Sequence, residues 1–231
     1  MKSKHDNINL KYWESRPETN WKRFKFKQPY KKGLERLKEK VLSKTNFDPT
    51  VLWQWGTMQS IAVIEILKTV EKKFGRDGQQ AVFECLRKIG YNIGEQITEG
   101  TSIPEDISIA EWLSFYATII NRIAYASLES PQIEDENKVI FHIDWCPHQD
   151  HYSAFDCRVQ RYFVQGMIDA AMDFIKSQRY SDTWDVVVKA TIPSGSETCY
   201  FEICRGNPDE KRKWAEYTKI LENKALEIAS K

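Results

Sequence analysis

Thiol, imidazole and carboxylate groups crowd into the short stretch 144–157, DWCPHQDHYSAFDC. Such groups bind soft metal ions, act as nucleophiles and transfer protons. Cys146, His148, His151 and Cys157 offer two sulfurs and two nitrogens, a set that zinc accepts. Their spacings, C-x-H, H-x2-H and H-x5-C, differ from those of structural zinc sites, so we predict no cofactor outright and keep zinc or iron as an alternative.

The same stretch also permits a thiol-based catalytic group. Cys157 would be the nucleophile, His148 or His142 the base, and Asp144 the group that orients the base. The sequence leaves open which histidine reaches the thiol. A third interpretation is that the stretch is only a strand end, a turn and a helix cap that happen to be polar.

A helix start positions Cys157 in this scheme. Ser153 and Asp156 form an S-x-x-D variant of the capping box, so Cys157 falls in the first or second turn of a helix over about 155–176. Unpaired N–H groups and the helix dipole favour a thiolate there, and Arg158 and Arg161 add positive charge. We therefore expect a lowered thiol pKa for Cys157, with Asp156 opposing it.

A strand over 138–146, KVIFHIDWC, would carry the other chemical groups. Because strand side chains alternate between faces, His142, Asp144 and Cys146 would stand in a row on one face. The core face would hold the apolar residues Val139, Phe141, Ile143 and Trp145. Cys199 would face the core from a later strand.

The remaining elements predict an α+β fold, with helices packed on a roughly four-stranded antiparallel sheet. Its helical N-terminal half is followed by ββαββ and a C-terminal helix. We expect helices over about 57–74, 77–98 and 109–122, a hairpin of 123–130 with 138–146, a hairpin of 184–192 with 198–204, and a last helix after Asn207. The capping box SIAE at 108–111 opens the third helix.

Two helix faces carry further expectations. The helix over 57–74 should bury one apolar stripe: Met58, Ile61, Ile64, Leu67, Val70 and Phe74. The next helix has Gly90 and Gly94 four residues apart, which lets another backbone approach closely. A homodimer through this glycine face is one possible use of it.

Charge divides the chain into two predicted regions. Lys and Arg outnumber Asp and Glu by 14 to 6 in residues 1–50, and are outnumbered by 27 to 20 in residues 51–231. We expect residues 1–50 to be a basic, aromatic arm that docks on a single α+β domain, 51–231. Docking on the acidic body explains the basic charge better than nucleic-acid binding does.

Several function classes lose their usual signatures. The chain has no apolar run long enough to span a membrane, and its first residues lack an apolar signal core, so we expect a cytoplasmic protein. Five cysteines without disulfide-scaffold spacing fit reduced thiols. There is no CxxC, phosphate-binding glycine loop or HExxH motif.

The pattern over about 80–203 resembles the L-2-amino-thiazoline-4-carboxylic acid hydrolase family and, more distantly, the 4-vinyl reductase-type small-molecule-binding domains. It consists of Cys146-Pro147 at a strand end, Cys157 opening a helix, Gly195 in a hairpin, and CYF at 199–201. The helix CLRKIGYNIGEQI also matches the glycine-bearing helix of the second group. Gln160 departs from the first family, which has an acidic residue there.

The resemblance implies hydrolysis of a small cyclic C–N substrate related to cysteine. Cys157, Cys146, His148 and Asp144 are the predicted catalytic residues. The predicted substrate contacts are His142, His151, Arg158, Arg161 and Cys199, since a substrate carboxylate needs cationic partners. The alternatives are a non-catalytic small-molecule or metal-binding sensor, and a scaffold protein that binds partners.

Overall fold

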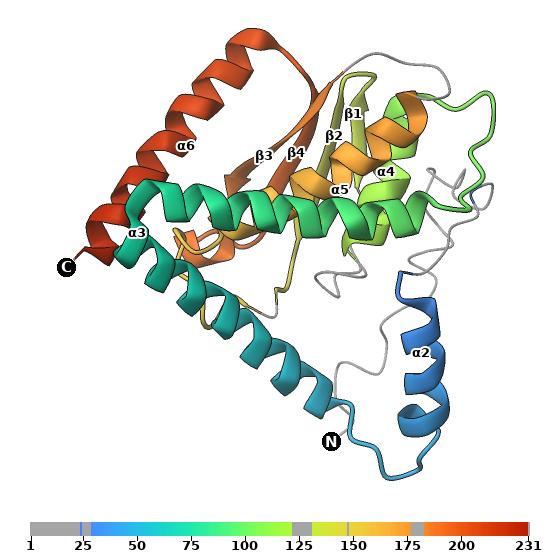
Figure 1. Ribbon diagram of the computed structural model, residues 1–231. Helices are drawn as coiled ribbons and strands as arrows, with labels where there is room; N and C mark the ends of the chain where they lie inside the picture. Colours follow the sequence, from blue (N-terminus) through green and yellow to red (C-terminus); the bar gives the residue numbers. More distant parts are fainter. Residues whose placement is uncertain (1–23, 25–28, 122–130, 147, 177–182, 231) are drawn as a thin grey trace.

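The computed structural model describes Phe24 and residues 29–121, 131–146, 148–176 and 183–230. It has the predicted α+β fold, with a helical N-terminal half, a four-stranded antiparallel sheet and a C-terminal helix (Figure 1). In chain order the elements are α2 (Lys31–Leu37), the π-helix η2 (Lys38–Leu42), α3 (Thr50–Thr98), α4 (Ile109–Ile120), β1 (Gln132–Asp135), β2 (Lys138–Ile143), α5 (Arg158–Lys176), β3 (Trp184–Ala190), the 3-10 turn η4 (Ile192–Ser194), β4 (Cys199–Arg205) and α6 (Pro208–Ala229).

The sheet has the strand order β1-β2-β4-β3, so the second hairpin places β4 beside β2. Phe141 of β2 lies opposite Phe201 of β4, and their rings stack with centroids 4.7 Å apart. These rings belong to the main core, which also contains buried side chains of α4 and α5. The predicted strand 123–130 lies outside the described residues, and β1 comes from residues 131–137, which were expected to form the turn of that hairpin.

The strand β2 is shorter than expected, and this changes what its end presents. Val139, Phe141 and Ile143 are buried as predicted, but the strand ends at Ile143. Because alternation stops there, Trp145 is 42% exposed and Cys146 is buried in the core. The predicted row of His142, Asp144 and Cys146 on one face is therefore wrong.

The helix α3 is divided at Gly75, whose φ of 59° and ψ of −138° are not helical. The break lies between the helices predicted over 57–74 and 77–98, at the first residue of the sequence GRDG, 75–78. We call residues 50–74 the leading segment and residues 76–98 the trailing segment. The two segments run in different directions from this glycine, and the trailing segment lies across α5 (Figure 1).

The trailing segment and α5 approach each other through glycines. A Cβ added to Gly90 would lie 2.0 Å from the carbonyl oxygen of Phe163, and one added to Gly166 would lie 2.0 Å from that of Arg87. Gly94 meets the Cβ of Ala170 in the same way. The glycine face is thus occupied inside the chain, so the expectation that it forms a dimer contact is wrong.

The helix α4 is buried almost all round, as its apolar sequence predicts. Its capping box is formed: the Ser108 hydroxyl accepts from the Glu111 N–H, and the Glu111 carboxylate accepts from the Ser108 N–H. The ring of Phe24 stacks on Phe115 of α4 at 4.2 Å. This residue of the basic arm is in the core, while residues 1–23 and 25–28 lie outside the described part.

Candidate functional site

Cys157 stands directly before α5, where two cavities meet. The predicted cap is formed, since the Ser153 N–H donates to the Asp156 carboxylate at 2.9 Å and the Asp156 N–H donates to the Ser153 hydroxyl at 3.3 Å. Successive turns from Ser153 then lead into the helix. The cap therefore fixes the backbone of Cys157, and its side chain borders a small cavity and a larger one.

The small cavity, which we call the thiol chamber, brings three cysteines together. Its volume is about 20 Å³, enough for roughly one water molecule. The residues that line it are Ile143, Cys146, His148, Gln149, Tyr152, Cys157, Gln160, Val188, Thr191, Pro193, Cys199 and Phe201. The structure thus brings Cys146, Cys157 and Cys199 to the wall of one cavity. The sequence pattern contains all three cysteines but left open whether they lie close together.

Burial dominates the acidity of these thiols. It raises the pKa of Cys157 to about 12 and that of Cys146 to about 11, and the pKa of Cys199 also rises. Hydrogen bonds oppose this shift: Thr191 bonds Cys157, and the Ile192 N–H donates to the Cys199 sulfur at 3.3 Å. The expected lowered pKa of Cys157 is wrong, because loss of hydration outweighs the helix start. All three thiols are neutral at pH 7.

His148 supplies a base on the wall of the thiol chamber. Its ring stacks on Tyr152 at 5.0 Å, and its Nε2 lies 3.4 Å from the Ser60 hydroxyl. Burial, then the nearby His151, lower the His148 pKa, so the imidazole is neutral at pH 7. Its buried Nδ1 has no hydrogen-bond partner among the described residues. A neutral imidazole with an unused nitrogen is suited to accept a proton.

The larger cavity, which we call the α6 cavity, lies on the other side of Cys157. It has a volume of about 300 Å³, the lower end of the range for small-molecule sites. Its lining comes from the start of α5, from the end of β3 and η4, and from α6: Ala154, Phe155, Cys157, Arg158, Arg161, Tyr162, Val188, Lys189, Ala190, Thr191, Ser194, Trp214, Tyr217, Thr218, Leu221 and Glu222.

Arg161 is the least neutralised cation of the α6 cavity. It donates a hydrogen bond to the hydroxyl of Thr218, and burial lowers its pKa. No carboxylate of the described residues lies within 4.0 Å of its guanidinium nitrogens, and the nearby Glu222 accepts from Tyr162 instead. Lys189, by contrast, pairs with Glu202 at 3.2 Å and lies over the Trp214 ring.

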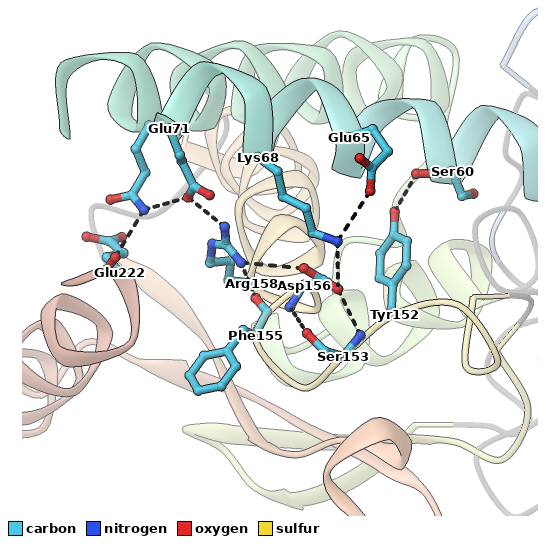
Figure 2. A network of polar contacts seen from close by, with 11 residues as sticks. Ser60, Glu65, Lys68, Glu71, Tyr152, Ser153, Phe155, Asp156, Arg158 and Glu222 are labelled. Atoms are coloured by element: carbon cyan, nitrogen blue, oxygen red, sulfur yellow. Dashed lines mark hydrogen bonds and ion pairs between the residues drawn. The ribbon is translucent and has the colours of Figure 1, made fainter. Parts of the chain in front are cut away.

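Arg158 lines the α6 cavity but its charge is already paired. Figure 2 shows its guanidinium between Glu71 of α3 and the loop before α5. It donates to Glu71 at 2.5 Å and to the Phe155 carbonyl at 2.6 Å, and both charged side chains are at most 6% exposed. Asp156 lies 3.9 Å from it and also contacts Lys68. The predicted substrate contact Arg158 is therefore part of a buried network that joins α3 to α5.

The other predicted residues lie apart from the thiol chamber. His142 faces the opposite side of β2, where its Nδ1 lies 2.9 Å from the Thr198 hydroxyl and its ring stacks on Tyr200. Asp144 is exposed, just beyond the end of β2. His151 is exposed and lines a separate cleft between α3 and α6. Of the described histidines, only His148 shares a cavity with Cys157.

Sequence reasoning missed the wall that α6 contributes. Trp214, Tyr217 and Leu221 repeat at helical spacing, which predicts only that the helix packs. The structure places them around the α6 cavity. Nothing in their spacing indicates that the helix leaves a ligand-sized space over β3.

Two negative findings concern the described residues only. No three His, Cys, Asp or Glu side chains in that part of the chain are arranged to hold a metal ion. No described helix is both long and apolar enough to cross a membrane.

Comparisons with known proteins identify a relative that aligns with nearly the whole chain. No protein-family model matches the chain. An uncharacterized protein of Archaeoglobus fulgidus is 49% identical over 216 residues, spanning 93% of this chain and 95% of that protein. Among solved structures, a trafficking protein particle complex subunit 3 from Naegleria fowleri, covalently bound to palmitic acid, has a TM-score of 0.44 at 11% identity, covering 65% of this chain and 96% of that one.

Proposed function

We propose that the protein hydrolyses a small cyclic C–N compound that carries a carboxylate, and that the reaction depends on a cysteine. The chain belongs to the same family as the uncharacterized Archaeoglobus fulgidus protein, whose name gives no activity, so the proposal is drawn from the site itself. The observation that carries this proposal is the place of Cys157, between a ligand-sized cavity and a chamber that holds a neutral histidine. The resemblance to thiazoline-carboxylate hydrolases points to the same substrate class.

Arg161 binds the substrate in this proposal. A substrate carboxylate in the α6 cavity would pair with the Arg161 guanidinium, which no described carboxylate contacts. Hydrogen bonds between two charged groups are stronger than those between neutral groups. The aromatic side chains of Trp214 and Tyr217 would enclose the ring. The cavity volume of about 300 Å³ restricts the ligand to a small molecule.

Cys157 and His148 perform the chemistry in this proposal. The thiol is neutral at pH 7, so it needs a base, and His148 takes its proton as the sulfur adds to the carbon of the C=N bond. The ring nitrogen takes up a proton from water as the sulfur adds. The His148 imidazolium then protonates the ring sulfur while the bond between that sulfur and the same carbon breaks, which opens the ring and frees a thiol on the substrate. Water adds to the carbon with His148 as the base, the bond from the carbon to Cys157 breaks, and the imidazolium returns the proton to the Cys157 sulfur. Cys146 and Cys199 keep the chamber walls polarisable and uncharged.

Turnover of 2-amino-thiazoline-4-carboxylate, followed by the release of product thiol, tests the proposal. We expect Cys157→Ser and His148→Gln to lower kcat by about 10²-fold or more, as for loss of a nucleophile or a general base. Arg161→Gln should instead raise KM, because it removes substrate binding.

The exposed Cys85 provides the matched control, since Cys85→Ser removes a thiol away from both cavities and should leave turnover unchanged. Unchanged turnover in Cys157→Ser would eliminate the thiol mechanism.

A non-catalytic sensor is the second candidate, and the raised pKa values of all three chamber thiols favour it. Such a protein would bind the same small carboxylates without consuming them. Calorimetric titration distinguishes the two: binding that depends on Arg161, with no product formed, selects the sensor.

A further inference from the structure

The leading segment of α3 exposes an unusual number of large apolar side chains. Trp55, Met58 and Ile66 are 58–60% exposed. Other exposed apolar residues of this segment are Val51, Leu52, Trp53, Ile61, Val63 and Phe74. Such a concentration on a single helix exceeds the scattered exposure that is normal for a monomer's surface.

Part of the exposed set forms a stripe on the side of the helix away from the body. Thr57, Ile64 and Leu67 are buried against the rest of the chain. On the opposite side a second stripe recurs at intervals of four or three residues: Val51, Trp55, Met58, Ala62 and Ile66. This is the spacing of a helix seam that pairs with another helix.

The composition of the segment matches the centre of a protein interface. Residues 50–64 contain no charged side chain, although the helix there is largely exposed. Interface centres are depleted of charge and enriched in Trp and Met. Helices that lie on membrane surfaces carry Lys and Arg on their polar face, which this stretch lacks.

The start of the helix has few packing contacts of its own. Residues 50–56 have no buried side chain, and most of the stability of a helix in a protein comes from packing of its apolar face. The segment points away from the sheet (Figure 1). A surface that adds apolar contacts here would therefore stabilise the helix as well as hide its stripe.

We propose that the leading segments of two copies of this chain pair antiparallel, crossing near Met58, to form a dimer. The stripe is complementary to itself in this register, because the largest side chain, Trp55, falls opposite Ala62 of the partner subunit. Val51 falls opposite Ile66 of the partner subunit in the same way. A two-fold contact of this kind closes on itself, so assembly stops at two copies.

Sedimentation of the full chain at micromolar concentration tests the pairing. We expect wild type to sediment as a dimer, and Trp55→Glu and Met58→Glu to sediment as monomers with unchanged circular dichroism. Both side chains are more than half exposed, so the fold tolerates the charge. The control Ile220→Glu places the same charge at a 51%-exposed site on α6 and should leave the dimer intact.

A cross-link tests the crossing point. In a Cys85→Ser background, Met58→Cys should form an inter-chain disulfide on mild oxidation, whereas Ile220→Cys should not.

Three outcomes would overturn the proposal: a monomeric wild type, a dimer that survives Met58→Glu, or a monomer that binds lipid vesicles through Trp55. A dimer that dissociates in Met58→Glu but gives no Met58→Cys cross-link would overturn the antiparallel crossing.

Discussion

Cys157 and Arg158 are neighbours at the start of α5, yet they face two opposite kinds of surroundings. On the Arg158 side every charge has a partner, in the buried network of Glu71, Asp156 and Lys68. On the Cys157 side the chamber thiols are held protonated by burial, and the adjoining α6 cavity leaves space for a ligand beside Arg161.

The two sides differ in their expected roles: the Arg158 side positions the start of α5, and the Cys157 side would carry the proposed chemistry. The Arg158 side fixes the position of the helix start against α3 through matched charges, although the Arg158 Nε has no hydrogen-bond partner among the described residues. The Cys157 side keeps unused capacity, including a histidine nitrogen without a described partner. Variants on each side should therefore fail differently, the first in stability and the second in turnover.

The largest stability effect is expected from breaking the buried pair. Glu71→Leu removes the closest partner of the buried Arg158 charge, leaving only Asp156 at 3.9 Å, and should lower the free energy of unfolding by about 3 kcal/mol. The double variant Glu71→Leu/Arg158→Met should recover much of this loss, because both charges are then absent. Urea denaturation measures both, and Glu65→Gln, at a partly exposed pair, should cost less than about 1 kcal/mol. A loss in Glu71→Leu no greater than in Glu65→Gln would refute a supporting role for the network.

A smaller effect is expected from the contact that positions both sides together. Gly166→Ala places a methyl group 2.0 Å from the Arg87 carbonyl oxygen, so α5 must shift away from α3. We expect a loss of about 1–3 kcal/mol, typical of overpacking, together with reduced turnover. Gly33→Ala, where an added Cβ meets nothing within 4 Å, is the control. Equal stability of the two variants would show that the contact between α3 and α5 can accommodate the added methyl group.

The last effect concerns the thiols and appears only at high pH. A folded-state pKa of about 12 for Cys157, against an ordinary 9.0, means that the folded chain keeps a proton that the unfolded chain loses. Stability present below pH 9 should therefore fall as the pH rises from about 9 to 12. The melting temperature of Cys157→Ser should fall less steeply than that of wild type as the pH rises across this range. Equal slopes for the two proteins would show that Cys157 is hydrated.

Much of the fold follows from local signals in the sequence. The capping boxes at Ser108 and Ser153 and the break at Gly75 each depend on a few neighbouring residues, and all three appear in the structure. The β4 strand and α6 also begin close to where the pattern predicts them. Local chemistry was sufficient for these elements.

The site depended on contacts that the sequence does not encode locally. Cys146 faces the thiol chamber because β2 stops three residues earlier, a boundary that alternation cannot reveal. The Cys157 pKa is decided by desolvation from distant elements rather than by the helix dipole. Arg158 and Arg161 are indistinguishable by sequence, yet only Arg158 meets the Glu71 carboxylate from α3.

Ser60 connects two surfaces of the leading segment. Its hydroxyl lies 3.4 Å from Nε2 of His148, and its carbonyl accepts a hydrogen bond from Tyr152, while Met58 two residues away points to the outer stripe. This one helical turn therefore contacts the imidazole on one side and carries the outer stripe on the other. If a second copy covers the outer stripe, the proposed turnover per chain should rise with protein concentration, so that the molecule would respond to its own abundance.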